Sequence, residues 1–345
     1  MKAVFYERDS VIRVGEVAAA HPRDDEIQIR VAFGGICGTD LGIYHGKMDW
    51  RVGKSQILGH EISGTIEKLG KGVSGFRVGD PVTVMPLKPC GHCPACLAGH
   101  SHICHNLKFI GIDEPGGFQD FWNVPAACAF KLPPTVALER GALIEPIAVA
   151  CHDVRMSDLR QGEVAVVLGG GPIGALIGLV AKDRGSQVIV SEINPHRSQI
   201  LRELGLEVID PRTCDLVRLV EERSEGAGAD VVFEVTGHPS GIEIATKLPR
   251  TRGRIVVVGI FGTPPPVDLF RLFWRELRLL GARVYEKQDF ERAIQLAAEG
   301  NSPFDRLISD VLPMHEAFQG IRRMDAGGNV MKILLKWDQI TPSAT

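Results

Sequence analysis

Two kinds of hydrophobic pattern divide the chain. From residue 1 to about residue 145, short segments alternate apolar and polar side chains, as in residues 26–31 (EIQIRV), and many glycines separate these segments. Alternation with a period of two predicts β-strands, and the glycines between them predict turns and loops. We therefore expect a mostly β region with long loops in this part of the chain.

The pattern changes near Gly162. Residues 164–168 (VAVVL) form a continuous apolar run, which is followed by a glycine cluster and a helical pattern through Arg184. Fully apolar strands that alternate with helices predict a parallel sheet covered on both faces. Further strands are expected at residues 187–190, 230–233, 254–258 and 329–336, and further helices at about 195–204, 239–248 and 287–300.

Length and composition narrow the class of protein. A chain of 345 residues suggests two domains. The formal net charge of −3 gives no electrostatic reason to expect nucleic acid as a partner. The N-terminus shows no secretory signal, and the longest apolar stretch, residues 174–181, is shorter than the roughly 20 residues that cross a bilayer. We expect a cytoplasmic protein with no membrane partner.

A glycine-rich motif directly follows the apolar run. It has the pattern GxGxxG, and its residues are Gly169, Gly171, Pro172, Ile173 and Gly174. Between a strand and a helix, such glycines permit a tight turn, close approach of the backbone to a pyrophosphate, and close packing of helix on strand. The N-terminus of the helix then faces the phosphates. The motif predicts a dinucleotide site, and a glycine-rich connection that binds no nucleotide is the alternative.

An acidic residue, Glu192, stands 18 residues after Gly174, at the end of the next expected strand. A carboxylate there accepts hydrogen bonds from the adenosine ribose and repels a 2′-phosphate, which favours NAD over NADP. Arg197 complicates this interpretation, because a nearby arginine can accommodate the 2′-phosphate. We expect NAD, with NADP as the alternative.

Four of the eight cysteines crowd into fifteen residues, with the spacing Cx2Cx2Cx7C. They are Cys90, Cys93, Cys96 and Cys104. Four thiolates satisfy the tetrahedral preference of zinc and leave no open position, so we expect a structural zinc here and not a catalytic one. A redox CxxC pair, a nucleic-acid zinc ribbon and an iron–sulfur cluster are the alternatives.

Metal-capable residues also occur at three separated places. They are Cys37 in GICGTD, His60 and Glu61 in GHE, and Glu145 in LIEP. Thiolate, imidazole and carboxylate are the ligand types of catalytic zinc sites, which keep one position open. The spacing alone does not establish that these residues meet in the fold.

Five motifs in a fixed order make the chain resemble one protein family. CGTD, GHE, the four-cysteine loop, the EP dipeptide and GGGPIG, with KILL near the end, occur as in the medium-chain zinc-dependent alcohol dehydrogenases. The resemblance covers essentially the whole chain and is closest to the sorbitol, butanediol and threonine dehydrogenase branch.

The resemblance implies an α/β fold of two domains. A GroES-like, mostly β catalytic domain is expected at residues 1–147 and 287–345, with a structural zinc lobe at about 88–106. Between its two parts, at residues 148–286, we expect a Rossmann NAD-binding domain with a doubly wound parallel sheet.

The resemblance also implies roles for the separated residues. Cys37, His60 and either Glu61 or Glu145 ligate a catalytic zinc, because the two glutamates can trade places in this branch. Asp40 resembles the carboxylate that orients His60.

Thr39 resembles the hydroxyl that takes the substrate proton. Many relatives place a histidine at the position of Gly42, so the proton must leave by another route, for which His45 is a candidate.

The implied reaction transfers hydride from a secondary alcohol to NAD and gives a ketone. The branch handles mainly polyols, vicinal diols and sugar alcohols; L-threonine and a sugar acid are alternative substrates. Zinc lets an alcohol ionise near neutral pH, and the nicotinamide carries the redox step. The family further implies two zinc ions per subunit and a homotetramer or homodimer. A non-catalytic NAD-binding protein is a remote alternative, since it predicts loss of metal ligands that are all present here.

Overall fold

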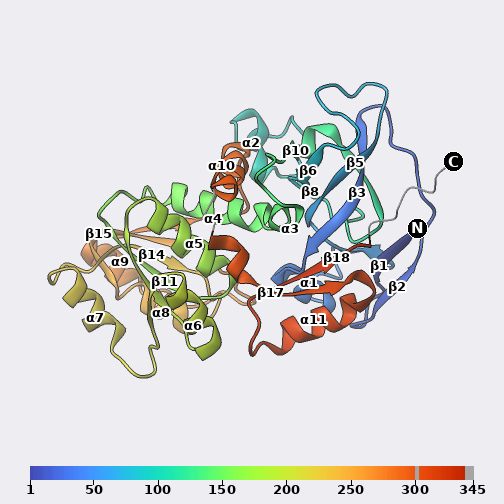
Figure 1. The fold of residues 1–345 in the computed structure, drawn as a ribbon. Helices are drawn as coiled ribbons and strands as arrows, with labels where there is room; N and C mark the ends of the chain where they lie inside the picture. The colour runs from blue at the N-terminus through green and yellow to red at the C-terminus, as the bar shows by residue number, and fades with distance from the viewer. Residues whose placement is uncertain (300–302, 339–345) are drawn as a thin grey trace. The chain divides into compact units, whose positions relative to one another are not determined.

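The computed structural model describes residues 1–299 and 303–338, and the chain divides into two compact units (Figure 1). The first unit consists of Met1–Glu145 and Phe290–Thr345, and the second of Pro146–Asp289. The chain therefore leaves the first unit once and returns to it.

The second unit contains a parallel sheet of six strands in the order β13-β12-β11-β14-β15-β16. Numbered along the chain, this order is 3-2-1-4-5-6, the order of a Rossmann sheet. The expected doubly wound parallel sheet is therefore confirmed. The strands are β11 Val164–Leu168, β12 Gln187–Ser191, β13 Glu207–Ile209, β14 Ala229–Glu234, β15 Pro249–Val257 and β16 Arg278–Gly281.

Helices connect these strands, and local sequence signals start them. Asn194, Asp215 and Asp268 each precede a helix and accept hydrogen bonds from backbone N–H groups of its first turn. Proline opens three helices, a position at which the missing N–H costs nothing. The helices are α4 Ile144–Met156, α5 Pro172–Asp183, α6 Pro195–Glu203, α7 Leu216–Arg223, α8 Pro239–Ala245 and α9 Leu269–Arg275.

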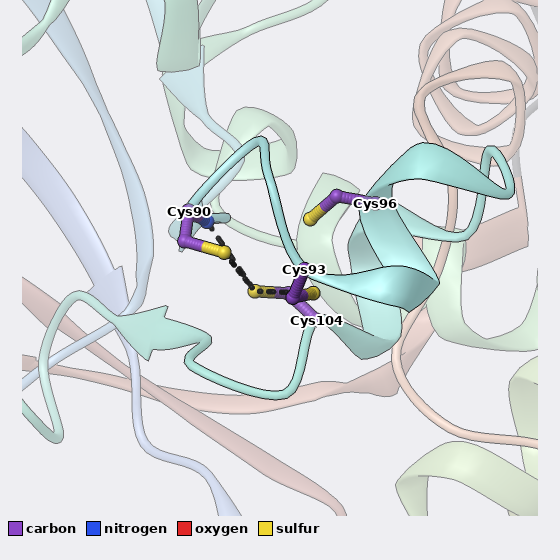
Figure 2. A group of neighbouring side chains, drawn as sticks. All are labelled: Cys90, Cys93, Cys96 and Cys104. Carbon is purple, nitrogen blue, oxygen red and sulfur yellow. Dashed lines mark hydrogen bonds between the residues drawn. The ribbon is translucent and has the colours of Figure 1, made fainter.

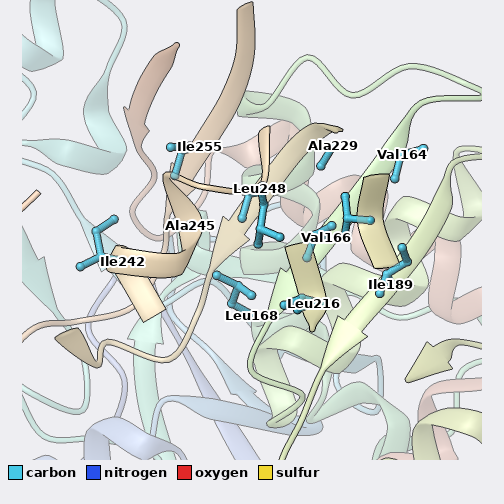
Figure 3. Packing of buried hydrophobic residues seen from close by; sticks show 12 residues of the cluster. Val164, Val166, Leu168, Ile189, Leu216, Ala229, Ile242, Ala245, Leu248 and Ile255 are labelled. Atoms are coloured by element: carbon cyan, nitrogen blue, oxygen red, sulfur yellow. The ribbon is translucent and has the colours of Figure 1, made fainter. Parts of the chain in front are cut away.

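The core of this unit packs strand side chains against helices (Figure 3). Val164, Val166 and Leu168 of β11 belong to the cluster, and the alternate residue Val167 is fully buried as well. Successive side chains of a strand point to opposite faces, so both faces of β11 are covered. This two-sided burial explains the continuous apolar run. The other buried members are Ile189, Leu216, Val220, Ala229, Val232, Ile242, Ala245, Leu248 and Ile255.

The first unit is mostly β, as expected. Its largest sheet has the order β10-β6-β5-β3-β18-β17, and β9 also pairs with β3. A three-stranded sheet has the order β2-β1-β4, and β7 pairs with β8. The strands are β1 Lys2–Tyr6, β2 Ile12–Glu16, β3 Glu26–Gly35, β4 Gln56–Ile57, β5 Glu61–Leu69, β6 Pro81–Val84, β7 Leu87–Lys88, β8 Lys108–Phe109, β9 Phe121–Pro125, β10 Ala129–Lys131, β17 Ile308–Pro313 and β18 Lys332–Lys336.

The helices of the first unit are short, apart from the two that follow the return of the chain. They are α1 Gly38–Tyr44, α2 Pro94–Leu97, α3 Leu138–Gly141, α10 Lys287–Ala298, which begins in the second unit, and α11 Ala317–Ala326. Among the described residues, no helix has both the length and the apolar character that a membrane crossing requires.

The central strand β3 shows what its alternating sequence encodes. The polar residues Glu26 and Gln28 of this strand are buried and Arg30 is half-buried; Gln28 Nε2 donates to the Ala20 carbonyl at 2.8 Å and to Asn123 Oδ1 at 3.0 Å. Arg30 Nη2 donates to Glu67 Oε2 at 2.7 Å. Because β3 pairs with three strands, its alternation marks two packed faces and not a face in water.

Two expected elements differ in extent. The strand expected at 329–336 begins only at Lys332, because Gly327 and Gly328 have positive φ and the Met331 N–H donates to the Ser309 hydroxyl. The helix expected at 287–300 ends at Ala298, and its last expected residue, Gly300, lies outside the described residues.

Candidate active site

Cys37 lies at the junction between β3 and α1. It is the N-cap of α1, with extended backbone angles, and its N–H donates to Asp40 Oδ2 at 2.8 Å. The Asp40 N–H in turn donates to the Cys37 carbonyl at 3.0 Å. This reciprocal arrangement fixes the cysteine relative to the first turn of the helix, in which Thr39 is partly buried.

His60 and Glu61 lie where β5 begins. The preceding Gly59 has φ of +95°, and a Cβ there would lie 2.2 Å from the Phe118 ring, so glycine is required. Glu61 is directly opposite Gly35, near the end of β3. His60 and Glu61 are 2% and 1% exposed, so both polar side chains are buried.

These elements bring three metal-capable side chains together. One ligand atom each of Cys37, His60 and Glu61 lies within 4.8 Å of the others. A thiolate, an imidazole and a carboxylate form a donor set suited to a catalytic zinc, with a fourth position left for substrate. Glu145, in the first turn of α4 and 5% exposed, is not part of this group of three.

Unpartnered polar atoms test the fit of a metal ion. Asp40 Oδ1 and His60 Nδ1 are both buried without a hydrogen-bond partner, whereas the buried Glu61 Oε2 forms an ion pair with Lys332. Such groups are costly unless something satisfies them. Asp40 Oδ1 lies 4.0 Å from His60 Nδ1, too far for a hydrogen bond, so the orienting role of Asp40 stays a prediction.

The charges around His60 also favour a cation. Burial lowers the pKa of His60, but the Cys37 thiol and the carboxyl groups of Asp40 and Glu145 outweigh that effect and raise the pKa to about 10. The site thus carries excess negative charge, which a proton on His60 offsets here and which a bound divalent cation would offset in its place.

A second set of residues supports His60 from outside the metal group, and the sequence patterns did not reveal it. The Phe109 ring lies edge-on to His60, with ring centres 5.3 Å apart. The Phe109 N–H donates to Asp113 Oδ2 at 2.7 Å, and Arg51 donates to both Asp113 oxygens at 2.6 Å. No metal-ligand or catalytic motif contains these residues.

The route of the proton beyond Thr39 stays a prediction. His45 Nε2 lies 2.6 Å from Asp325 Oδ1 on α11, and both side chains are partly exposed. Nothing lies within 4 Å of a Cβ added at Gly42, so the position where relatives carry histidine faces open space.

The four-cysteine loop forms a second, separate group (Figure 2). The sulfur atoms of Cys90 and Cys93 lie 3.5 and 3.7 Å from that of Cys104, and none of the eight cysteines forms a disulfide. Backbone N–H groups of Cys90, His105 and Asn106 donate to sulfur atoms at 3.3 to 3.4 Å. The donor set is that of a closed tetrahedral zinc site.

Backbone hydrogen bonds prepare part of this loop to bind a cation. The N–H of His92 is the largest cause that lowers the pKa of the Cys90 thiol, to about 5. The hydrogen bond from the Cys96 N–H is the largest cause that lowers the pKa of the Cys93 thiol. Both thiols thus favour the thiolate form that binds metal.

The glycine motif forms the turn between β11 and α5. Gly169 has φ of +98°, and a Cβ at Gly174 would lie 1.8 Å from the Gly169 carbonyl oxygen. Gly171 is the N-cap of α5 and Pro172 its first residue, while Ile173 is half-buried. The N-terminus of α5 therefore lies at the carboxyl end of the central strand β11, where doubly wound sheets bind phosphates.

Glu192, which directly follows β12, stabilises this turn through hydrogen bonds. Its Oε2 accepts a hydrogen bond from the Gly170 N–H at 2.8 Å, and its Oε1 from the Asn194 N–H at 2.6 Å. Arg197 Nη1 lies 3.6 Å from the position of a Cβ on Gly171. A carboxylate and a guanidinium therefore both border the glycine turn.

The loop after β14 completes this side of the sheet, and the sequence reasoning missed it. Thr236 Cγ2 lies 3.0 Å from the position of a Cβ on Gly169. The buried Glu234 holds the loop by accepting hydrogen bonds from the N–H groups of Thr236, at 2.9 Å, and Gly237, at 3.2 Å. The sequence EVTG after an apolar strand was the available signal, since β11 and β14 flank the point where the strand order reverses.

Comparison with known proteins decides the family. Residues 23–134 match the model of the alcohol dehydrogenase GroES-like domain, and residues 172–299 match that of zinc-binding dehydrogenases. A 2-dehydro-3-deoxy-L-galactonate 5-dehydrogenase from Pseudoalteromonas atlantica is 49% identical over 336 residues, which cover 97% of this chain and 98% of the relative. The chain belongs to the zinc-dependent medium-chain alcohol dehydrogenases. The expected enzyme class is thereby confirmed.

Two further similarities place this dehydrogenase within its family. An L-galactonate-5-dehydrogenase from Escherichia coli is 32% identical over 295 residues, covering 85% of this chain and 86% of the relative. A crystal structure from Sinorhizobium meliloti with bound NADP has a TM-score of 0.91 and 33% identity, covering 97% of this chain and 98% of that one. The expected GroES-like and Rossmann folds are thus confirmed, as are zinc and a nicotinamide dinucleotide as cofactors.

Proposed function

We propose that the enzyme oxidises a secondary hydroxyl group of a six-carbon sugar acid, at carbon 5, to a ketone. The relative that is 49% identical across nearly its whole length acts on 2-dehydro-3-deoxy-L-galactonate, and a second relative acts on L-galactonate. The observation that carries the proposal is the meeting of Cys37 with the buried His60 and Glu61 in a chain this similar to a sugar-acid 5-dehydrogenase. The resemblance to the family predicted a polyol as the main substrate class and a sugar acid as an alternative.

The protein residues have separate tasks in this reaction. Cys37 and His60 would hold the catalytic zinc, with Glu61 or Glu145 as the third ligand. Zinc, when bound, supplies Lewis acidity that lowers the pKa of an alcohol. From its place in the first turn of α1, the Thr39 hydroxyl would accept the proton of the substrate hydroxyl and pass on its own proton. A nicotinamide held at the glycine turn would supply the hydride acceptor for this two-electron oxidation.

NAD is the proposed dinucleotide. The Glu192 carboxylate is fixed by two backbone N–H groups beside the glycine turn, so its negative charge cannot easily withdraw from a 2′-phosphate. The turn residues Gly169, Gly171 and Gly174 would accept the pyrophosphate. Arg197 near Gly171 would contact a phosphate oxygen or the ribose. We expect kcat/KM with NAD to exceed that with NADP by about tenfold or more, which corresponds to about 1.4 kcal/mol.

The four-cysteine loop would hold the second zinc of each subunit, at Cys90, Cys93, Cys96 and Cys104. We also propose that residues 1–147 and 287–345 form the catalytic domain, with its zinc lobe at about 88–106, and that residues 148–286 form the NAD-binding domain. Thiolate ligands of this kind persist in a reducing compartment, which supports the cytoplasm as the location.

A homodimer or homotetramer is the proposed assembly, formed through the second unit. β16 is one of the two edge strands of the parallel sheet, and β13 is the other. Just before it, α9 exposes Phe270, Phe273 and Trp274 by 69%, 75% and 70%. Exposed aromatic side chains beside an unpaired strand edge are typical of a protein–protein interface. A second copy of the chain, related by a two-fold axis, would bury them. Light scattering measures the molar mass of the wild-type enzyme and of the Trp274→Glu variant. The proposal predicts an oligomeric wild type and a smaller assembly for the variant, and a monomeric wild-type enzyme would contradict it.

The experiment that tests the substrate is a set of initial rates of nicotinamide reduction. The panel contains 2-dehydro-3-deoxy-L-galactonate, L-galactonate, sorbitol, 2,3-butanediol and L-threonine, each with NAD and with NADP. We expect the highest kcat/KM for a sugar acid, and loss of the rate when the catalytic metal is removed. A higher kcat/KM for a neutral polyol or for L-threonine would replace the sugar acid in this proposal. Tight NAD binding without turnover of any of these substrates would favour the non-catalytic alternative.

A further inference from the structure

A buried lysine contacts the metal group, and none of the roles assigned so far uses it. Lys332, the first residue of β18, forms an ion pair with Glu61, and the two side chains are only 4% and 1% exposed. A buried ammonium group is costly unless a negative group compensates it. In the part of the chain that the structure describes, Glu61 is the carboxylate that pairs with it.

The sheet is shaped to let these two residues meet. Gly35 of β3 is opposite Glu61 on one side and opposite Leu334 of β18 on the other. A Cβ at Gly35 would lie 2.0 Å from Glu61 Oε2 and 3.1 Å from Lys332 Cε. Glycine therefore leaves the space in which the two side chains pass across β3.

Glu61 consequently faces two cationic partners. Its carboxylate belongs to the group with Cys37 and His60, and it also contacts Lys332. The contact joins Lys332 Nζ to one oxygen of this carboxylate, Oε2. The charge of the carboxylate is therefore compensated by the ammonium group.

We propose that Lys332 is a positioning residue that makes Glu61 a releasable ligand of the catalytic zinc. When Glu61 leaves the metal, Lys332 compensates its charge, so the carboxylate can withdraw without being stranded in a buried site. This lowers the cost of opening one position for substrate. The inference rests on the proposed zinc ligands and adds a reason why Glu61 and Glu145 can exchange.

The test is metal exchange in the full-length Lys332→Met variant, with cobalt(II) at the catalytic site. Methionine keeps the length of the side chain and removes its charge. Glu61 then loses its alternative partner, and we expect release of cobalt to a chelator to slow by about tenfold. The visible absorption of the bound cobalt(II) should change in the direction expected for a higher coordination number. An unchanged or faster release with an unchanged spectrum overturns the inference.

Two comparisons separate this role from general effects. Lys332→Arg keeps the charge and should exchange metal like the wild type, as should Lys336→Met, which removes an exposed lysine from the same strand. Removing any positive charge near a metal could slow release. The Lys332→Met change is therefore repeated in a Glu61→Gln background, where its effect should vanish. If the effect persists there, Lys332 does not act through Glu61.

The Cys37→Ser variant keeps failure of this inference distinct from failure of the proposed zinc site. Loss of one metal ion per chain in Cys37→Ser marks the site, and unchanged exchange in Lys332→Met then overturns the inference alone. Full metal content in Cys37→Ser overturns the zinc site, and the inference with it.

Discussion

The two groups of residues that we propose to bind zinc are built in opposite ways. The four cysteines come from one loop of fifteen residues, and backbone N–H groups of that loop donate to their sulfur atoms. Cys37, His60 and Glu61 come from the cap of α1 and the start of β5, which the pairing of β3 with β5 brings together. The group of Cys37, His60 and Glu61 lies beside buried polar atoms without a hydrogen-bond partner, Asp40 Oδ1 and His60 Nδ1.

This difference separates stability from chemistry. A short loop with four like ligands can satisfy a metal completely, so it can hold the lobe together but offers no position for a substrate. A site assembled on a folded sheet can keep unlike ligands in place with one position open, because the sheet and not the metal fixes them. Variants of the two groups should therefore fail in different ways.

The largest effect is expected from His60→Ala. Loss of this ligand should empty the catalytic site and lower kcat/KM by about a thousandfold, because the metal contributes several kcal/mol of charge stabilisation. Zinc content should fall from two ions to one per chain while the melting temperature changes little. Steady-state kinetics and metal analysis measure this, with the exposed His100→Ala as control. Retained activity with a single zinc would assign catalysis to another site.

Cys104→Ser should produce the opposite pattern. The variant should also lose one zinc, but its free energy of unfolding should fall by several kcal/mol, since binding energy of a structural zinc is folding energy. In the protein that remains folded, kcat/KM should stay within about threefold of the wild-type value. Thermal unfolding and kinetics are compared with Cys214→Ser, outside the group. A selective loss of turnover without loss of stability contradicts the closed structural site.

Asp113→Asn should give a smaller effect that depends on pH. Burial raises the pKa of Asp113, but hydrogen bonds from Arg51 and from the Phe109 N–H outweigh this and hold it below its usual value. The ionised carboxylate therefore stabilises the fold above about pH 4 and stops doing so as the pH falls through its folded pKa. We expect Asp113→Asn to cost about 1.5–3 kcal/mol at pH 7, and less in acid.

Unfolding by urea at several pH values measures this loss. The control is Asp325→Asn, whose partner His45 is partly exposed and whose ion pair should contribute less than about 1 kcal/mol. Because Phe109 packs against His60, kcat/KM should fall as well. A loss that stays constant down to pH 2 would show that the charge of Asp113 is not responsible.

The smallest effect is expected from Gly42→Ala. A Cβ at this position meets nothing within 4 Å, and alanine in a helix is favoured over glycine by about 0.5–1 kcal/mol. The variant should unfold at a slightly higher temperature with kcat unchanged. A marked fall in kcat would show that the open space beside α1 serves the proton route.

The sequence predicted those parts of the molecule that are encoded by neighbours in the chain. The apolar run of β11, the glycine turn and the cysteine loop each lie within about fifteen residues, so their chemistry is visible locally. The meeting of Cys37 with His60 was expected only from resemblance to a family, since spacing does not reveal strand pairing.

The remaining features depend on distant register. Lys332 meets Glu61 because β18 and β5 flank the same glycine of β3, and residues 271 positions apart carry no common pattern. Arg51 and Asp113 likewise support Phe109 through contacts between loops, for which no period or motif exists. The expected strand at 329–336 was too long because glycine and a side-chain hydrogen bond, not hydrophobicity, set its start.

The most direct test of the contrast between the two sites is anomalous scattering at the zinc edge from crystals of zinc-replete enzyme. The account predicts two peaks in each chain. One lies among the four cysteine sulfur atoms with no other ligand, and one lies among Cys37, His60 and either Glu61 or Glu145 with a further position open. A single peak at the cysteine loop, in crystals of enzyme that turns over substrate, would contradict it.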